Sequence, residues 1–92
     1  MEKIEDEKGE NIRIILRGYI TENFLPSSGL KGFKDNDSFL EKGIIDSTGV
    51  LELLEFIEEK FNIRVEDEEI VPDNLDSLKK LTNFISRKLK LC

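Results

Sequence analysis

The sequence predicts an all-α domain of four helices, with a long ordered loop between the first two helices and a short third helix. Apolar residues recur at helical spacing in several stretches, and no stretch shows the strict alternation of a half-buried strand. Proline and glycine interrupt the pattern between the stretches. The 92 residues are expected to form one domain, residues 1–92, with a core from about residue 12 to 89 and a frayed charged segment at 1–9.

The first helix is predicted from five of the apolar residues that follow Asn11. They fall at i, i+3, i+4, i+7 and i+8, which is typical of one face of an amphipathic helix. Gly18 lies inside this helix and costs about 1 kcal/mol relative to alanine. Pro26 is expected to end it, because proline disfavours the helical conformation of the preceding residue. The face consists of Ile12, Ile15, Leu16, Tyr19 and Ile20.

Residues 26–45 form the long connection. A structureless loop of this length is uncommon in a small domain, and its apolar residues predict that it packs as an ordered layer. The stretch from Ser38 to Glu41 resembles a capping box for a single helical turn, with Gly43 after its end. The apolar residues of this connection are Leu30, Phe33, Phe39, Leu40, Ile44 and Ile45.

The second helix is expected from Ser47 to Phe61, with Asp46 as its N-cap. A short extended link and one further turn of helix, stopped by Pro72, are predicted after it. A second Asp-Ser pair, Asp76-Ser77, is expected to cap the last helix in the same way, with the helix running to about Leu89. The predicted apolar face of the last helix is Leu78, Leu81, Ile85 and Leu89, with Phe84 at one edge.

The charge excludes one class of partner and favours another. Acidic residues outnumber basic residues 20 to 14, a net charge of −6, which opposes binding to nucleic acid and suits a basic protein. Residues 37–70 hold 11 acidic and 3 basic side chains, so the negative charge surrounds Ser47. With no run of 18 apolar residues and no signal-like opening segment, a cytoplasmic location without membrane contact is expected.

The residue types argue against an enzyme. The chain has no histidine, which removes Ser-His triads, Cys-His pairs, histidine metal sites and the commonest general acid–base. Its single cysteine, Cys92, is the last residue and is expected to be an unordered bystander. Residues 35–46 resemble a calcium loop only superficially, since Leu40 stands where the turn requires glycine, and no metal site is expected.

The helix after Asp46 distinguishes its Ser47 from an ordinary serine beside a cap. At 100° per residue, Ser47 lies on the seam between an apolar arc and an acidic arc. The acidic residues repel one another at i+3 and i+4, at about 0.2–0.5 kcal/mol a pair, so they are either a docking surface or a solvated face. The apolar arc is Val50, Leu53, Leu54, Ile57 and Phe61, and the acidic arc is Glu52, Glu55, Glu58 and Glu59.

The stretch FLEKGIIDSTGVLELLEFIEEKFNIRVEDEEI resembles the centre of an acyl carrier protein. It has the Asp-Ser pair after a glycine and two apolar residues, and an acidic helix ending in Glu-Glu-x-Phe. The resemblance covers about residues 12–89 and implies an acyl-carrier-like four-helix bundle. It implies that Ser47, flanked by Asp46, receives a 4′-phosphopantetheine arm from coenzyme A through a phosphopantetheinyl transferase. The thiol of the arm would then hold an acyl or aminoacyl group as a thioester.

The surface of the second helix departs from that of fatty-acid carriers. Those carriers have apolar residues one, four and eight positions after the serine, where this chain has Thr48, Leu51 and Glu55. Phe56 is expected to compensate as an apolar contact. The full set of expected partner-binding residues is Thr48, Leu51, Glu52, Glu55, Phe56 and Glu59.

The C-terminal stretch EEIVPDNLDSLKKLTNFI is more similar to stand-alone carriers that serve amino-acid-activating or specialised acyl-activating enzymes. The resemblance therefore implies a monomeric carrier for a specialised pathway of fatty-acid, polyketide or nonribosomal-peptide type. Its partners would be the transferase, an acyl- or amino-acid-activating ligase, and a downstream synthase or transferase. The alternative is a small acidic helical adaptor that docks to a basic protein and carries no prosthetic group.

Overall fold

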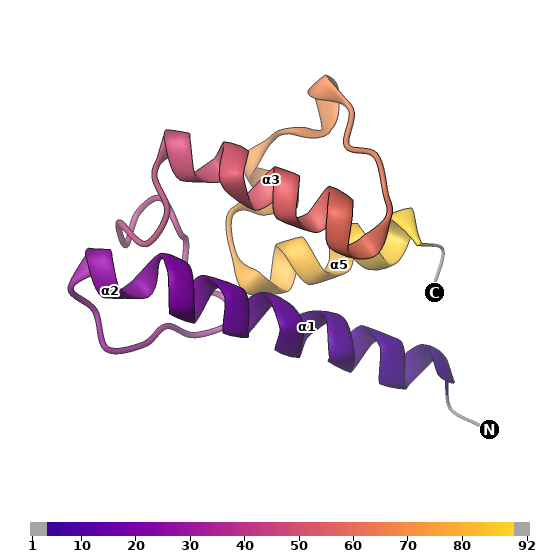
Figure 1. Ribbon diagram of the computed structural model, residues 1–92, viewed down its shortest axis with the longest axis horizontal. Coiled ribbons are helices and arrows are strands. Elements are labelled where there is room, and N and C mark those ends of the chain that lie inside the picture. Colours follow the sequence, from indigo (N-terminus) through magenta and orange to yellow (C-terminus); the bar gives the residue numbers. More distant parts are fainter. Residues whose placement is uncertain (1–3, 90–92) are drawn as a thin grey trace.

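Three long helices make up half of the chain in the computed structural model, which describes residues 4–89 (Figure 1). They are α1 (Ile4–Asn23), α3 (Ser47–Phe61) and α5 (Leu78–Lys88). Three short helices stand between them: α2 (Leu25–Ser28), the 3₁₀ helix η1 (Asp67–Glu69) and α4 (Pro72–Leu75). Within residues 4–89 there is no strand, which confirms the all-α prediction. The radius of gyration is 12.8 Å, close to the ~12 Å of a compact domain of this length.

Helix α1 buries the face that the spacing predicts, but its ends differ from the prediction. Ile12, Leu16 and Ile20 are buried, and Ile15 and Tyr19 of the same face are half-buried. Gly18 is exposed, with open space where a β-carbon would be. The helix starts at Ile4, before the expected Asn11, and ends at Asn23. Pro26 lies in the first turn of α2, where a missing N–H costs no hydrogen bond, so the long connection begins only at Gly29.

The connection between α2 and α3 is an ordered layer, as predicted. Phe33, Phe39, Ile44 and Ile45 are all buried in the core. The predicted turn also forms, because the Ser38 hydroxyl accepts the N–H of Glu41 at 3.1 Å and Gly43 adopts a left-handed φ of 73°.

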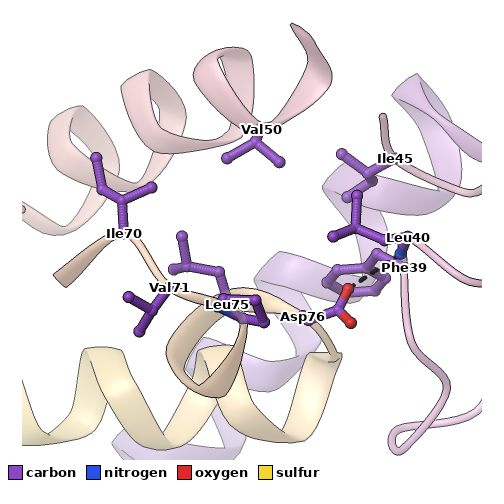
Figure 2. A pocket seen from close by; sticks show the side chains of 9 residues that line it. Phe39, Leu40, Ile45, Val50, Ile70, Val71, Leu75 and Asp76 are labelled. Carbon is purple, nitrogen blue, oxygen red and sulfur yellow. Dashed lines mark hydrogen bonds between the residues drawn. The ribbon is translucent and has the colours of Figure 1, made fainter. Parts of the chain in front are cut away.

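Two leucines of the connection are not buried, contrary to the prediction. Leu30 is 38% exposed and Leu40 is 48% exposed. Leu40 instead lines an apolar cavity together with Phe39 and Ile45 (Figure 2).

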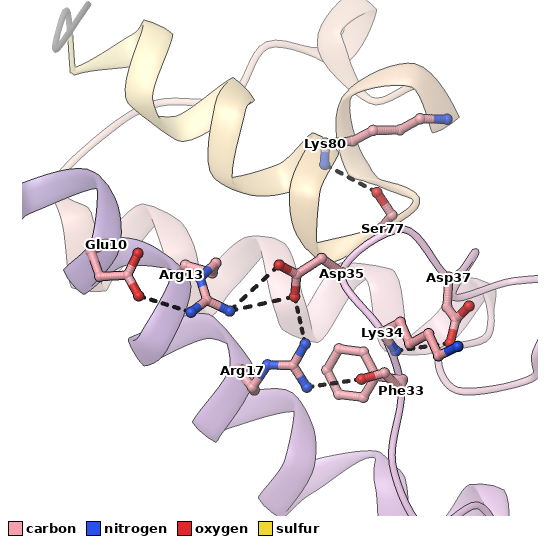
Figure 3. Close-up of polar contacts among 9 residues, drawn as sticks. All are labelled: Glu10, Arg13, Arg17, Phe33, Lys34, Asp35, Asp37, Ser77 and Lys80. Atoms are coloured by element: carbon pink, nitrogen blue, oxygen red, sulfur yellow. Dashed lines mark hydrogen bonds and ion pairs between the residues drawn. The ribbon is translucent and has the colours of Figure 1, made fainter. Parts of the chain in front are cut away.

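Two arginines of α1 hold the connection in place (Figure 3). Arg17 donates to the carbonyl of Phe33 at 2.9 Å and to the carboxylate of Asp35 at 2.6 Å. Arg13 reaches Asp35 at 3.5 Å, and the pKa of Arg13 is raised by its hydrogen bond to Glu10 and by the charges of Glu10 and Asp35. The backbone carbonyl of Asp35 accepts the N–H of Lys79 at 2.9 Å, so this one residue connects α1, the loop and α5.

The segment between α3 and α5 contains one more helix than the sequence indicated. The predicted turn is present as η1, but Pro72 begins α4 in addition to ending the preceding turn, because its fixed φ suits the first position of a helix. In α4 only Leu75 is buried.

Helix α5 is capped by one member of its Asp-Ser pair. The hydroxyl of Ser77 accepts the N–H of Lys80 at 3.0 Å, and Ser77 is only 3% exposed. Asp76 does not cap the helix, contrary to the prediction, and its carboxylate instead contacts the loop at residues 38–40.

Helix α5 packs against α1 and contributes its apolar face to the core. Phe84, expected at the edge of that face, is 2% exposed and therefore lies inside it. Leu89 is only half-buried and packs against the core from its margin. The buried residues of this helix are Leu78, Leu81, Phe84 and Ile85.

Candidate functional site

The start of α3 is built by Asp46, which caps the helix as predicted. Its backbone is extended, with φ −97° and ψ −175°, and its carboxylate accepts the N–H of Gly49 at 2.8 Å. Ser47 is then the first residue of the helix and is exposed, as is Thr48. Because Asp46 does the capping, the hydroxyl of Ser47 is not needed for the hydrogen bonds of the helix.

Gly49 lets the first turn of α3 pack closely against Phe24, the residue that follows α1. A β-carbon at this position would lie 2.9 Å from Cε1 of Phe24 and 3.0 Å from Cγ2 of Ile45, distances that side chains do not tolerate without movement. Gly49 is therefore required by close packing rather than by an unusual φ. The sequence does not predict this packing role, because Phe24 and Ile45 lie outside the helix and reach Gly49 only in the folded chain.

The two arcs of α3 lie where the helical spacing places them. Leu53, Leu54 and Ile57 are buried, whereas Glu52, Glu55 and Glu59 are exposed. Two residues, Val50 and Phe61, are only half-buried.

Glu58 does not belong to the free acidic face. It is half-buried, and its carboxylate accepts the N–H of Val65 at 2.9 Å, which ties the extended link after α3 back onto the helix. The exposed acidic face of α3 thus consists of Glu52, Glu55 and Glu59.

Two apolar side chains accompany this acidic face in different ways. Leu51 is 62% exposed and stands free in solvent. Phe56 is half-buried and stacks on Tyr19 of α1, with ring centroids 3.8 Å apart and planes at 8°. Burial, with smaller effects from Glu52 and Glu55, raises the pKa of Tyr19. Phe56 therefore helps to hold α3 against α1, and only part of its ring is open to a partner.

An apolar cavity of about 130 Å³ opens beside the start of α3 (Figure 2). Ile45 and Val50, which precede and follow Ser47 in the chain, both line it. The remaining walls come from the turn after Ser38, which lies beside Ile45, and from the segment around α4 (Figure 2). Its principal side chains are Phe39, Leu40, Ile45, Val50, Val71 and Leu75.

A second hollow, of about 380 Å³, is polar and lies between the start of α3 and the junction of α1 with α2. Thr48 and Glu52 line it from α3, and Asn23 and Ser27 line it from the other side. Residues beside Ser47 thus line two spaces of opposite character: Val50 lines the apolar cavity and Thr48 lines the polar hollow.

Within residues 4–89, no three histidine, cysteine, aspartate or glutamate residues come together in a way that would hold a metal ion. None of the helices in that part of the chain has the length and apolar character needed to cross a membrane. Cys92, expected to be a bystander, lies outside the described residues.

No model of a known protein family matches the chain. No curated protein matches it either. The function is therefore inferred from the residues of the site and their geometry.

Proposed function

We propose that the chain is a stand-alone carrier protein that holds acyl or aminoacyl groups on a 4′-phosphopantetheine arm attached to Ser47. One observation carries this proposal: Ser47 is exposed on the first turn of α3, its neighbour Asp46 does the capping, and Ile45 and Val50 on either side of it line an apolar cavity. The chain itself is not an enzyme in this proposal. It delivers its cargo to partner enzymes in a specialised pathway.

The residues around Ser47 fit the arm. A phosphodiester on its hydroxyl would lie at the N-terminus of the 15-residue α3, where unpaired backbone N–H groups and the helix dipole favour an anion. The exposed Ser47 and Thr48 leave room for a transferase to approach. When bound, the arm supplies a thiol that holds the cargo as a thioester.

The helices support the same proposal through their arrangement. We propose that α1, α3, the η1–α4 segment and α5 correspond to the four helices of an acyl-carrier-like bundle, with residues 29–46 as its long loop. Asp46 fixes the start of α3, and Gly49 allows the ring of Phe24 to pack directly against that turn. A rigid attachment point matters for a carrier, because partner enzymes gain rate from a cargo presented in a fixed orientation.

The exposed acidic face of α3 is the proposed docking surface for partner enzymes. Glu52, Glu55 and Glu59 are exposed with Leu51 among them, which combines long-range attraction for a basic surface with one apolar contact. Thr48 and the open part of Phe56 complete the surface. The transferase, the activating ligase and the downstream synthase or transferase are its proposed users.

The same acidic face supports a second candidate function. An adaptor that docks to a basic protein would need this surface and would need nothing attached to Ser47. The two candidates differ in one measurable property, which is whether Ser47 accepts the arm.

The deciding experiment is mass spectrometry of the purified chain after incubation with coenzyme A, magnesium and a broad-specificity phosphopantetheinyl transferase. We expect a mass gain of one phosphopantetheine in the native chain and in Ser27→Ala, an exposed serine used as control, and none in Ser47→Ala. Ser47→Ala should change stability by no more than about 0.5 kcal/mol, because the residue is exposed and makes no cap. If the native chain gains no mass, or if Ser47→Ala still gains it, the carrier proposal is wrong and the adaptor is the remaining candidate function.

The same assay tests the docking surface through its rate. Reversing the charge of Glu52 and Glu55 to lysine should slow modification and reduce its dependence on salt, because the attraction between the two proteins is weakened. Glu41→Lys makes the same kind of charge change on an exposed residue of the loop turn and serves as the control. Equal rates for all these variants would make the acidic face an ordinary solvated surface.

A further inference from the structure

The wall of the apolar cavity formed by the turn after Ser38 is held by one residue. The carboxylate of Asp76 accepts the hydroxyl of Ser38 and, at 3.0 Å, the N–H of Leu40. The backbone carbonyl of Asp76 accepts the N–H of Phe39 at 3.3 Å. Asp76 thus binds three consecutive residues of the turn, two of which line the cavity.

The other end of this wall is also fixed. The carbonyl of Phe39 accepts the N–H of Ile44 at 2.9 Å and the N–H of Ile45 at 3.3 Å, which joins the turn to the residues just before Ser47. Phe39 itself is 2% exposed and packs edge-on against Phe33. The wall therefore has little freedom to retreat from the cavity while the contacts of Asp76 persist.

The size and lining of the cavity define what would fit. A dry protein cavity of about 150 Å³ accepts one benzene, so a cavity of about 130 Å³ holds roughly five carbon atoms. The side chains that face it are apolar apart from Asp76, and each carboxylate oxygen of Asp76 already accepts a hydrogen bond. An ammonium or hydroxyl group inside would lose its water and find few free partners.

We propose that Asp76 is a specificity-determining residue that restricts the sheltered part of the cargo to about five apolar carbon atoms. This inference rests on the proposed function, since the cargo is presented on Ser47. Asp76 acts through the turn it holds: with the wall fixed, a longer apolar chain must leave the cavity and meet water. Releasing the turn would widen the cavity toward the loop and admit longer chains.

The test measures the depth of insertion directly, without any partner enzyme. The transferase loads the chain with saturated acyl groups of two to twelve carbons from the matching acyl-coenzyme A, and methyl NMR follows Ile45, Val50, Val71 and Leu75. In the native chain the methyl shifts should grow with acyl length to about five carbons and then stay constant. In Asp76→Ala and Ser38→Ala the growth should continue to at least eight carbons.

Asp73→Ala is the matched control, because Asp73 is exposed, lies on the short helix α4 that Asp76 directly follows, and carries the same charge without lining the cavity. It should behave like the native chain. Ser38→Ala keeps the test informative if Asp76→Ala does not fold, since it leaves the Leu40 contact with the carboxylate in place. The proposal would be overturned if the methyl shifts of the native chain kept growing beyond eight carbons. It would also be overturned if the shifts of the folded variants stopped growing at the same acyl length as in the native chain.

Failure to attach the arm would contradict the proposed function but leave the cavity testable. Free benzene and n-butylbenzene then serve as probes in the same NMR measurement. Benzene, the smaller probe, should shift the cavity methyls of the native chain and of both variants. n-Butylbenzene should shift them no more than benzene does in the native chain, because its extra carbons stay outside the cavity, and should shift them more than benzene does in the variants. A larger shift with n-butylbenzene than with benzene in the native chain would show that Asp76 sets no limit.

Discussion

The chain uses the pair Asp-Ser at the starts of both α3 and α5, and the two pairs divide their tasks differently. At α3 the aspartate caps the helix, with Asp46 accepting the N–H of Gly49, and Ser47 lies exposed in the first turn. At α5 the serine caps the helix, with Ser77 accepting the N–H of Lys80, and Asp76 remains outside to bind the loop. The position of the N-cap, on the first or the second residue of the pair, thus decides which of the two side chains takes no part in capping.

The difference shows how a surface site and a structural joint arise from the same two residues. Where aspartate is the cap, the free residue is a neutral hydroxyl at the positive end of a long helix, a suitable place for an attached phosphate. Where serine is the cap, the free residue is a carboxylate that can accept several N–H or O–H groups and join distant segments. Ser77 is 3% exposed, so its hydroxyl is also closed to any partner.

The largest effect on this comparison is expected from Asp76→Ala. It removes two hydrogen bonds to a charged acceptor that join the loop to the start of α5, and should lower the free energy of unfolding by about 2–3 kcal/mol. Denaturant unfolding would measure it, with Asp73→Ala as the control, expected within about 0.5 kcal/mol of the native chain. A loss below 0.5 kcal/mol in Asp76→Ala would mean that the second pair does not join the segments energetically.

Removing each cap separately should give a smaller effect. Asp46→Ala and Ser77→Ala each delete one side-chain acceptor at a helix start, and each should lower the free energy of unfolding by about 1 kcal/mol. The neighbouring Ser47→Ala deletes no cap and is the control. If Ser47→Ala were as destabilising as Ser77→Ala, the assignment of caps at the two helices would be wrong.

The acid dependence of stability should test the contact between η1 and α5. Glu69 accepts the N–H of Glu66 and pairs with Lys88 of α5 at 2.9 Å, and these contacts lower its pKa. Its contribution is present above its unfolded pKa of about 4.3 and is lost as the pH falls through the lower folded-state value. We expect Glu69→Gln to be less stable at pH 7 and to lose less stability between pH 5 and pH 3.

The matched control for this titration is Glu68→Gln, an exposed neighbour in the same short helix. It should keep the acid dependence of the native chain. Thermal unfolding at several pH values would measure all three proteins, and parallel curves for the native chain and Glu69→Gln would contradict the assigned role of Glu69.

The sequence was sufficient where periodicity or a local cap decides the structure. The buried faces of α1 and α3, the cap at Asp46 and the turn before Gly43 follow from spacing and short-range hydrogen bonding, so they could be predicted. The role of Asp76 could not, because its partners Ser38 and Leu40 are remote in the chain. The exposure of Leu40 and the cavity beside it likewise depend on how the loop packs against α4.

The features of the site can likewise be divided into those that the sequence predicts and those that depend on tertiary packing. Exposure of Ser47 and of the acidic residues on α3 follows from the helical spacing alone. The stacking of Phe56 on Tyr19 and the withdrawal of Glu58 to the N–H of Val65 depend on neighbours outside the helix. Only the three-dimensional arrangement shows that these two residues have structural partners.

The contact between Gly49 and Phe24 has a consequence for how related chains would vary. The ring of Phe24 fills the space where a β-carbon of residue 49 would stand, so the side chains allowed at these two positions depend on each other. A relative with alanine at position 49 would need a smaller residue at position 24, and a relative that keeps the ring would need the glycine. Paired substitution at these two positions would therefore identify chains that seat this helix in the same way, even where the residues around Ser47 differ.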